Sequence, residues 1–266
     1  MPIRKAGKRI AALALVCALA LPLSGCGNKS GAYDKALDYF GDGDYAQAAA
    51  AFLKLGDYLQ SETYAAYSQG LTYWEQGDFT AAEPYFEKTQ DFMYGQERYR
   101  YCHAGALEEA EEFSEAANWF TALGEFEDAP QRAAYCRARF AAGNADYETA
   151  LNNYQDADGY ADAAARLDAL NFEIYERAAA LRDAKDYEQA FTLFMMLGEN
   201  YDAQEQARVC KNYFLDQTYA EAEALIDSGD LQGAYDAFIT LSGYRDAAAR
   251  AGELAAELGL NTTEEE

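Results

Sequence analysis

The chain has few of the residues that build β-sheets and few of those that build reactive sites. Among its 266 residues there are one histidine, His103, and four prolines. After residue 26 there are a single valine and three isoleucines, although β-branched residues are enriched in strands. The composition therefore predicts an all-α protein.

Basic residues are also scarce. Lysine and arginine number 21 against 46 acids, so the formal net charge is −25 at pH 7. Affinity for nucleic acid comes mainly from basic side chains that neutralise phosphates, and this composition argues against nucleic acid as a partner. It also predicts repulsion from anionic lipid headgroups.

The N-terminal segment has the pattern of a secretion signal. Its first nine residues carry Arg4, Lys5, Lys8 and Arg9 and no acid, and residues 10–23 are almost entirely apolar. These 14 residues are too few for a helix that crosses a hydrocarbon core, which needs roughly 20 residues. We therefore expect a cleaved signal and no transmembrane anchor.

The apolar stretch ends in Leu23, Ser24, Gly25 and Cys26, which resembles the lipobox of bacterial lipoproteins. The resemblance implies that residues 1–25 are a cleaved lipoprotein signal peptide and that the Cys26 thiol carries a lipid. The chain would then be anchored at the extracytoplasmic face of a bacterial membrane. The alternative is an ordinary secretion signal followed by a chance cysteine. After cleavage, 17 bases and 46 acids give a net charge of −29, so the lipid would have to supply the attachment.

The remaining cysteines do not suit a disulfide framework. If Cys17 is removed with the signal and Cys26 is acylated, only Cys102, Cys136 and Cys210 remain. Three thiols cannot all pair with one another, even in an oxidising compartment. We expect buried free thiols.

Six segments share one spacing pattern. Each contains an acid followed by an aromatic residue or leucine, which we call the anchor. The anchors are Tyr45, Phe79, Phe113, Tyr147, Tyr187 and Leu231, separated by 34, 34, 34, 40 and 44 positions. An alanine follows each anchor by three residues and an aromatic residue follows by seven. Twelve residues before each anchor is a tyrosine, and we call these residues the tyrosine column: Tyr33, Tyr67, Tyr101, Tyr135, Tyr175 and Tyr219.

The offsets place each set of side chains on one face of a helix. The anchor and the residues three and seven later share a face, and the residues twelve, nine and six earlier share a face of a preceding helix. Each segment is therefore predicted to be a helical hairpin. The acid before the anchor is predicted to cap the second helix. Four aspartates are predicted to begin the first helix of the following hairpin: Asp128, Asp162, Asp202 and Asp246.

This pattern resembles the tetratricopeptide repeat, a 34-residue helical hairpin. Gly70 with Tyr73 and Ala82 with Phe86 show the match within one segment. The resemblance covers residues 33–258 and implies an α-solenoid of six hairpins forming a right-handed superhelix, with the first helices on its inner face. The family's proline at the end of the repeat is replaced by the aspartates.

Several local features refine this prediction. The fifth and sixth segments have 6 and 10 extra residues before their tyrosine, which predicts first helices longer by two to three turns. Pro84 inside a second helix predicts a kink. Residues 246–258 are predicted to form a C-terminal capping helix, and residues 259–266 a disordered acidic tail. Residues 26–32 would be a short tether that holds the first hairpins close to the membrane.

Candidate partner-binding residues lie on the groove side of the first helices, where the segments differ. They combine apolar or aromatic side chains with arginines, which suits an extended peptide with apolar anchors and a carboxylate. The candidates are Phe40, Tyr64, Leu71, Trp74, Arg98, Arg132 and Arg139. The alternative is that the rings cap one end of the solenoid and the arginines pair with surface acids. The tyrosine column could line the groove, but its recurrence in every segment favours packing.

No converging set of reactive residues is visible in the sequence. Phosphate loops, paired-cysteine metal spacings and nucleophile elbows are absent, and His103 falls in a column of polar residues. We therefore expect no enzymatic activity, cofactor or metal. The sequence favours a monomeric, membrane-anchored scaffold or adaptor that binds a protein or an extended peptide. The alternative is a surface receptor that binds glycan or peptidoglycan fragments through an aromatic groove.

Overall fold

A computed structural model describes residues 28–260, and this part of the chain is all-helical, without strands. The predicted signal peptide, Cys26 and residues 261–266 of the predicted tail lie outside the described residues. None of the helices described is both long enough and apolar enough to cross a membrane.

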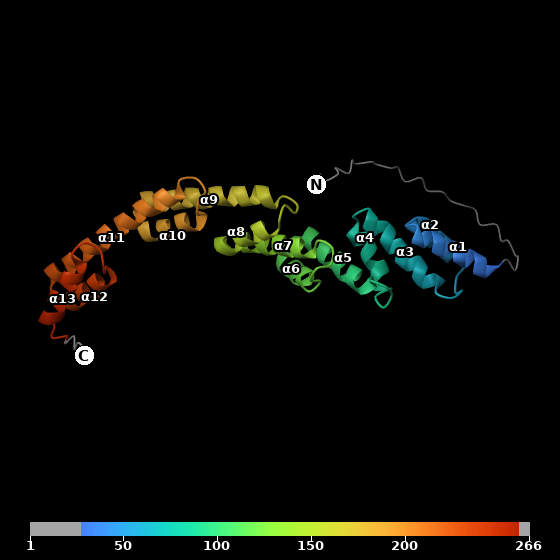
Figure 1. Cartoon of the computed structure of the whole chain (residues 1–266), viewed down its shortest axis with the longest axis horizontal. Helices are drawn as coiled ribbons and strands as arrows, with labels where there is room; N and C mark the ends of the chain where they lie inside the picture. Colours follow the sequence, from blue (N-terminus) through green and yellow to red (C-terminus); the bar gives the residue numbers. More distant parts are fainter. Residues whose placement is uncertain (1–27, 261–266) are drawn as a thin grey trace.

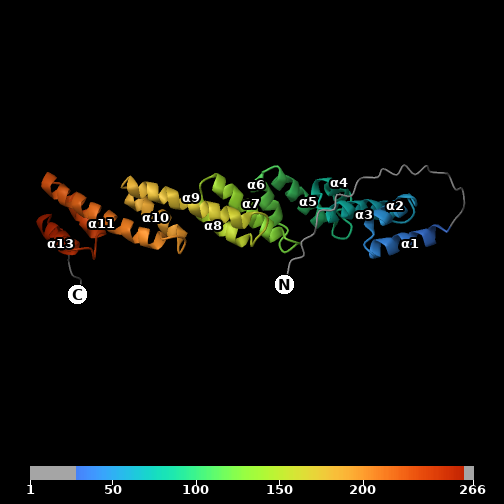
Figure 2. The same ribbon diagram turned by 90° about the horizontal axis from the view of Figure 1, so that it is seen from above.

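Thirteen helices make up residues 28–260. They are α1 (Lys29–Gly41), α2 (Tyr45–Leu53), α3 (Ser61–Glu75), α4 (Phe79–Glu87), α5 (Gly95–Glu109), α6 (Phe113–Thr121), α7 (Ala129–Gly143), α8 (Tyr147–Asp156), α9 (Ala163–Asp183), α10 (Tyr187–Leu197), α11 (Ala203–Ser228), α12 (Leu231–Thr240) and α13 (Ala247–Glu257). Each helix packs mainly on the helices before and after it in sequence. The result is an elongated array from α1 to α13, as expected of an α-solenoid (Figures 1 and 2).

The array begins four residues earlier than predicted. Asn28 is the N-cap of α1, and its side-chain oxygen accepts a hydrogen bond from the Gly31 amide at 3.1 Å. This cap starts the helix at Lys29, so residues 29–32, predicted to be part of the tether, are helical.

The predicted acids occupy the N-cap positions of all the second helices, which are α2, α4, α6, α8, α10 and α12. In four of these helices the carboxylate accepts a hydrogen bond from the backbone amide three residues later. The four capping acids are Asp78, Asp146, Asp186 and Asp230. The other two, Asp44 and Glu112, occupy the position without this bond. The local sequence therefore sets where the second helices begin.

Small residues and aromatic rings fill the space inside each helix pair. Phe86 is fully buried, and a Cβ atom added at Gly70 would come within 2.9 Å of its ring. Alanine occupies the equivalent position in the other pairs and is likewise fully buried, as at Ala36 and Ala104. The close approach of the two backbones therefore requires a small residue at this position.

Two first helices are much longer than the others, as predicted. Helix α9 has 21 residues and α11 has 26, whereas α3, α5 and α7 each have 15. The predicted capping helix is α13, which begins after Asp246. Helix α4 continues through Pro84 and has nine residues, the same length as α2 and α6.

Candidate functional site

The tyrosine column ties each helix pair to the next helix along the chain. In four places a phenol donates a hydrogen bond to the aspartate at the N-cap of the next first helix. The pairs are Tyr101 with Asp128, Tyr135 with Asp162 at 2.7 Å, Tyr175 with Asp202 at 2.6 Å and Tyr219 with Asp246 at 2.5 Å. None of these aspartates caps its own helix through its side chain. Their side chains therefore serve the contact between helix pairs.

These bonds favour the charged form of Asp162 and Asp202. The phenol of Tyr135, followed by the guanidinium of Arg166, lowers the pKa of Asp162. Hydrogen bonds from Tyr175 and then from Gln206 lower the pKa of Asp202 in the same way. These two acids are thus held as carboxylates at neutral pH.

The first two tyrosines of the column lack this partner. Gln60 and Tyr94 occupy the positions where the later helix pairs have aspartate. Tyr67 is only 2% exposed, and its phenol instead accepts a hydrogen bond from Arg98 Nε at 3.3 Å. Tyr33 packs edge-on against Phe52, with the ring centroids 5.5 Å apart.

A second column of residues becomes visible when the first helices are compared from their N-caps. We compare the fourth residue after the N-cap in α3, α5, α7, α9, α11 and α13. In this order the residues are Tyr64, Arg98, Arg132, Arg166, Gln206 and Arg250. The spacing from the anchors does not reveal the last three. The extra residues of α9 and α11 shift the register of Arg166 and Gln206, and no anchor follows Arg250. Arg166 donates to Asp162 at 2.8 Å, so this column shares the acids bound by the tyrosines.

Arg132 is held inside the array. It is 5% exposed, and both its Nε and an Nη bond one oxygen of Glu108, at 2.8 and 2.7 Å. Its other Nη donates to the phenol of Tyr101 at 3.1 Å, and its guanidinium lies 4.6 Å from the centre of the Phe120 ring. Tyr160 donates to the second oxygen of Glu108 at 3.0 Å. Arg132 thus forms a buried, fully partnered ion pair.

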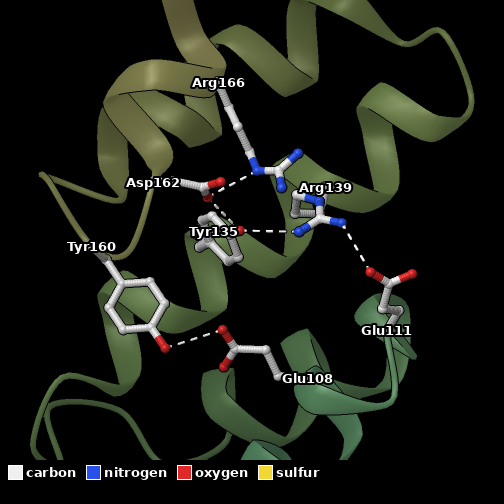
Figure 3. Close-up of polar contacts among 7 residues, drawn as sticks. All are labelled: Glu108, Glu111, Tyr135, Arg139, Tyr160, Asp162 and Arg166. Atoms are coloured by element: carbon white, nitrogen blue, oxygen red, sulfur yellow. Dashed lines mark hydrogen bonds and ion pairs between the residues drawn. The ribbon is translucent and has the colours of Figure 1, made fainter.

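Arg139 belongs to a neighbouring series of polar contacts that crosses three helix pairs (Figure 3). It donates to the phenol of Tyr135 at 3.0 Å and lies 3.5 Å from Glu111. Because Tyr135 also binds Asp162, these contacts run from the turn after α5 through α7 to the start of α9. This series of contacts therefore holds consecutive first helices together.

The two arginines line a hollow of about 460 Å³. Four acids line it with them, namely Glu108, Glu109, Glu111 and Asp128. A peptide carboxylate entering this hollow would meet arginines that are already bonded, and an excess of negative charge. Of the three predicted arginines, Arg98 retains a free donor, because its Nη1 is buried without a hydrogen-bond partner in the described part of the chain.

The predicted apolar groove residues lie in the packing between helix pairs. The ring of Phe40 lies 5.3 Å from that of Tyr64, and Leu71 is buried. The ring of Trp74 lies 4.8 Å from that of Tyr101, with the Arg98 guanidinium 4.7 Å from it. These residues form one continuous layer with the tyrosine column rather than a separate strip.

The three thiols are buried and free, as predicted. Burial raises the pKa values of Cys102 and Cys136 to about 12, which keeps them protonated and unreactive. His103 lies 2.9 Å from Glu83 and packs edge-on against Trp119. Within residues 28–260 no group of histidine, cysteine and acidic residues is suited to hold a metal ion.

No protein-family model matches this chain, and no curated protein matches it.

Proposed function

We propose that this protein is a non-enzymatic scaffold or adaptor, anchored by lipid on Cys26 at the extracytoplasmic face of a bacterial membrane, that binds another protein or an extended peptide. In this proposal residues 33–258 form a right-handed superhelix of six tetratricopeptide-like repeats followed by a capping helix. The supporting observation is that helices pack in sequence into an elongated array, which exposes a large surface for its size.

The chemistry of the described residues also supports a binding role. Several buried polar groups, such as Arg132 with Glu108 and Tyr135 with Asp162, are engaged in contacts between helix pairs. The ring of Trp74, a candidate for stacking on a sugar, packs against Tyr101 and Arg98. These contacts favour a protein partner over a glycan.

The anchor can be tested by metabolic labelling with a radioactive fatty acid. The wild-type chain should incorporate the label, whereas the Cys26→Ala variant should not, because no other thiol lies in the lipobox. A Cys17→Ala variant serves as a control and should be labelled like the wild type. Equal labelling of wild type and Cys26→Ala would contradict the lipoprotein assignment.

The scaffold role can be tested by photo-crosslinking on intact cells of the native host. A photoreactive amino acid is placed at single exposed positions along the array, and the captured material is identified by mass spectrometry. One protein captured at several neighbouring positions supports a scaffold. Capture of wall material alone would instead support the glycan receptor.

A further inference from the structure

The lengthening of α9 separates α8 from α10. Six extra residues at 1.5 Å per residue add about 9 Å to α9, and packed helices lie about 8–10 Å apart. The added length therefore equals the width of one helix.

Two adjoining hollows lie between α8 and α10. One has a volume of about 660 Å³ and the other about 520 Å³, and they share Glu148, Thr192 and Met196 in their linings. Helix α9 contributes Asn171 to the first hollow and Leu181 to the second. We call the combined space the α8–α10 slot. Its walls, α8 and α10, have 10 and 11 residues, so it is about as long as three helical turns.

The α10 side of the slot is apolar and exposed. Met195 is 56% exposed and Met196 is 36% exposed, and both line the slot beside Phe191. Methionine side chains are flexible and polarisable, so they adapt to the side chains of a docked helix. Helix α9 lines the slot with Asn171, which is 8% exposed.

The rim of the slot is acidic. Glu148 and Glu188 line it, and Arg177 is the one base among its lining residues within the described chain. A second copy of this protein would be repelled because it carries the same strongly negative charge. A partner with basic residues flanking an apolar face matches both features of the slot.

We propose that the α8–α10 slot binds one basic amphipathic helix of a partner protein. The apolar face of that helix packs on Phe191, Met195 and Met196, and its lysines or arginines lie beside Glu148 and Glu188. The slot opens between second helices, whereas the predicted groove lies on the first helices. The inference rests on the proposed scaffold function and specifies the class of partner.

The test measures binding of a fluorescent model helix of about 18 residues to the purified full chain by anisotropy. The probe carries leucine on one face and lysine elsewhere, and a second probe has glutamate in place of lysine. The lysine probe should bind and the glutamate probe should not. The double variant Met195→Asn/Met196→Asn should bind the lysine probe about tenfold more weakly or worse, because two apolar contacts are lost.

The matched control is Ile239→Asn. Ile239 occupies on α12 the position that Met195 occupies on α10, it is 51% exposed, and it lies outside the slot. The affinity of the Ile239→Asn variant for the lysine probe should stay within about twofold of the wild-type affinity. Both substituted surfaces are exposed, and circular dichroism checks that each variant keeps its helix content.

Several results would overturn the slot proposal. They are an absence of binding, equal affinity for the two probes, or equal losses in the slot variant and the Ile239→Asn control. Unchanged affinity of the slot variant would mean that the lysine probe associates through charge alone. These outcomes are independent of the scaffold role, since capture of a partner at other positions would uphold that role while the slot proposal fails.

Discussion

At the scale of single residues, the tyrosine column explains why aspartate recurs at the start of the later first helices. An N-cap aspartate usually accepts a hydrogen bond from its own helix. Here Asp162 instead accepts from Tyr135, 27 residues earlier, and from Arg166. One short acid thus connects two helix pairs, and its position at a helix N-terminus also favours its charge.

Removing one of these phenols should weaken the array. The Tyr135→Phe variant loses the hydrogen bonds to Asp162 and Arg139, both charged, and should lower the free energy of unfolding by about 1–2 kcal/mol. Urea denaturation followed by circular dichroism measures the change. Tyr213→Phe is the control, since Tyr213 is 52% exposed, and it should stay within about 0.5 kcal/mol. Equal effects of the two variants would show that the phenol of Tyr135 contributes nothing.

Breaking the buried ion pair should be more damaging. The Glu108→Ala variant leaves Arg132 charged and buried without its carboxylate, and we expect a loss of about 3–5 kcal/mol in unfolding free energy. The neighbouring Glu109 is exposed, so Glu109→Ala should change stability by less than about 0.5 kcal/mol. A small effect of Glu108→Ala would mean that the aromatic rings around Arg132 are sufficient to hold its charge.

At the scale of secondary-structure elements, the length of α9 decides whether a slot exists. Deleting residues 167–172 would restore the separation between Asp162 and Tyr175 to the seven residues found between Asp128 and Tyr135. Helix α9 would then have the 15 residues of α7, and α8 and α10 would approach by about 9 Å. We expect a folded protein that no longer binds the lysine probe.

A corresponding deletion in α11 provides the control. Removing residues 207–216 restores the same seven-residue separation between Asp202 and Tyr219 and keeps every residue that lines the α8–α10 slot. This variant should retain its affinity for the lysine probe. Loss of binding in both variants, with helix content maintained, would show that the length of the array matters and that the slot does not.

At the scale of the whole molecule, shape and charge act together. Each helix depends mainly on its sequence neighbours, so the array has no single central core. A net charge of −25, or −29 after the predicted cleavage, adds repulsion along its length. The stability of the array is therefore expected to depend on ionic strength.

Raising the salt concentration should stabilise the protein. Sodium chloride at about 0.5 M reduces the Debye length to a few ångströms and screens repulsion between exposed acids. The urea midpoint should rise between low and high salt. A falling midpoint would show that surface ion pairs, such as Arg208 with Glu205, outweigh the repulsion.

The helices, their caps and the buried thiols could be predicted because they follow from local periodicity. Phe86 and Gly70 occupy fixed offsets, and a helix converts such offsets directly into a packed face. The lengths of α9 and α11 followed from the same spacing. The bond between Tyr160 and Glu108 could not be found in this way, because it joins residues 52 positions apart that no shared offset relates.

Residue spacing alone was enough to predict paired helices, the positions where most of them begin and the side chains that lie between them. The roles of the arginines become clear only in the folded array. Arg98, Arg132 and Arg139 were candidates for binding a carboxylate, yet each donates to a phenol of the tyrosine column. Partner choice among buried charges depends on distances between helix pairs, and so does the α8–α10 slot. Those distances are set by packing across the array and not by the spacing of residues along one helix.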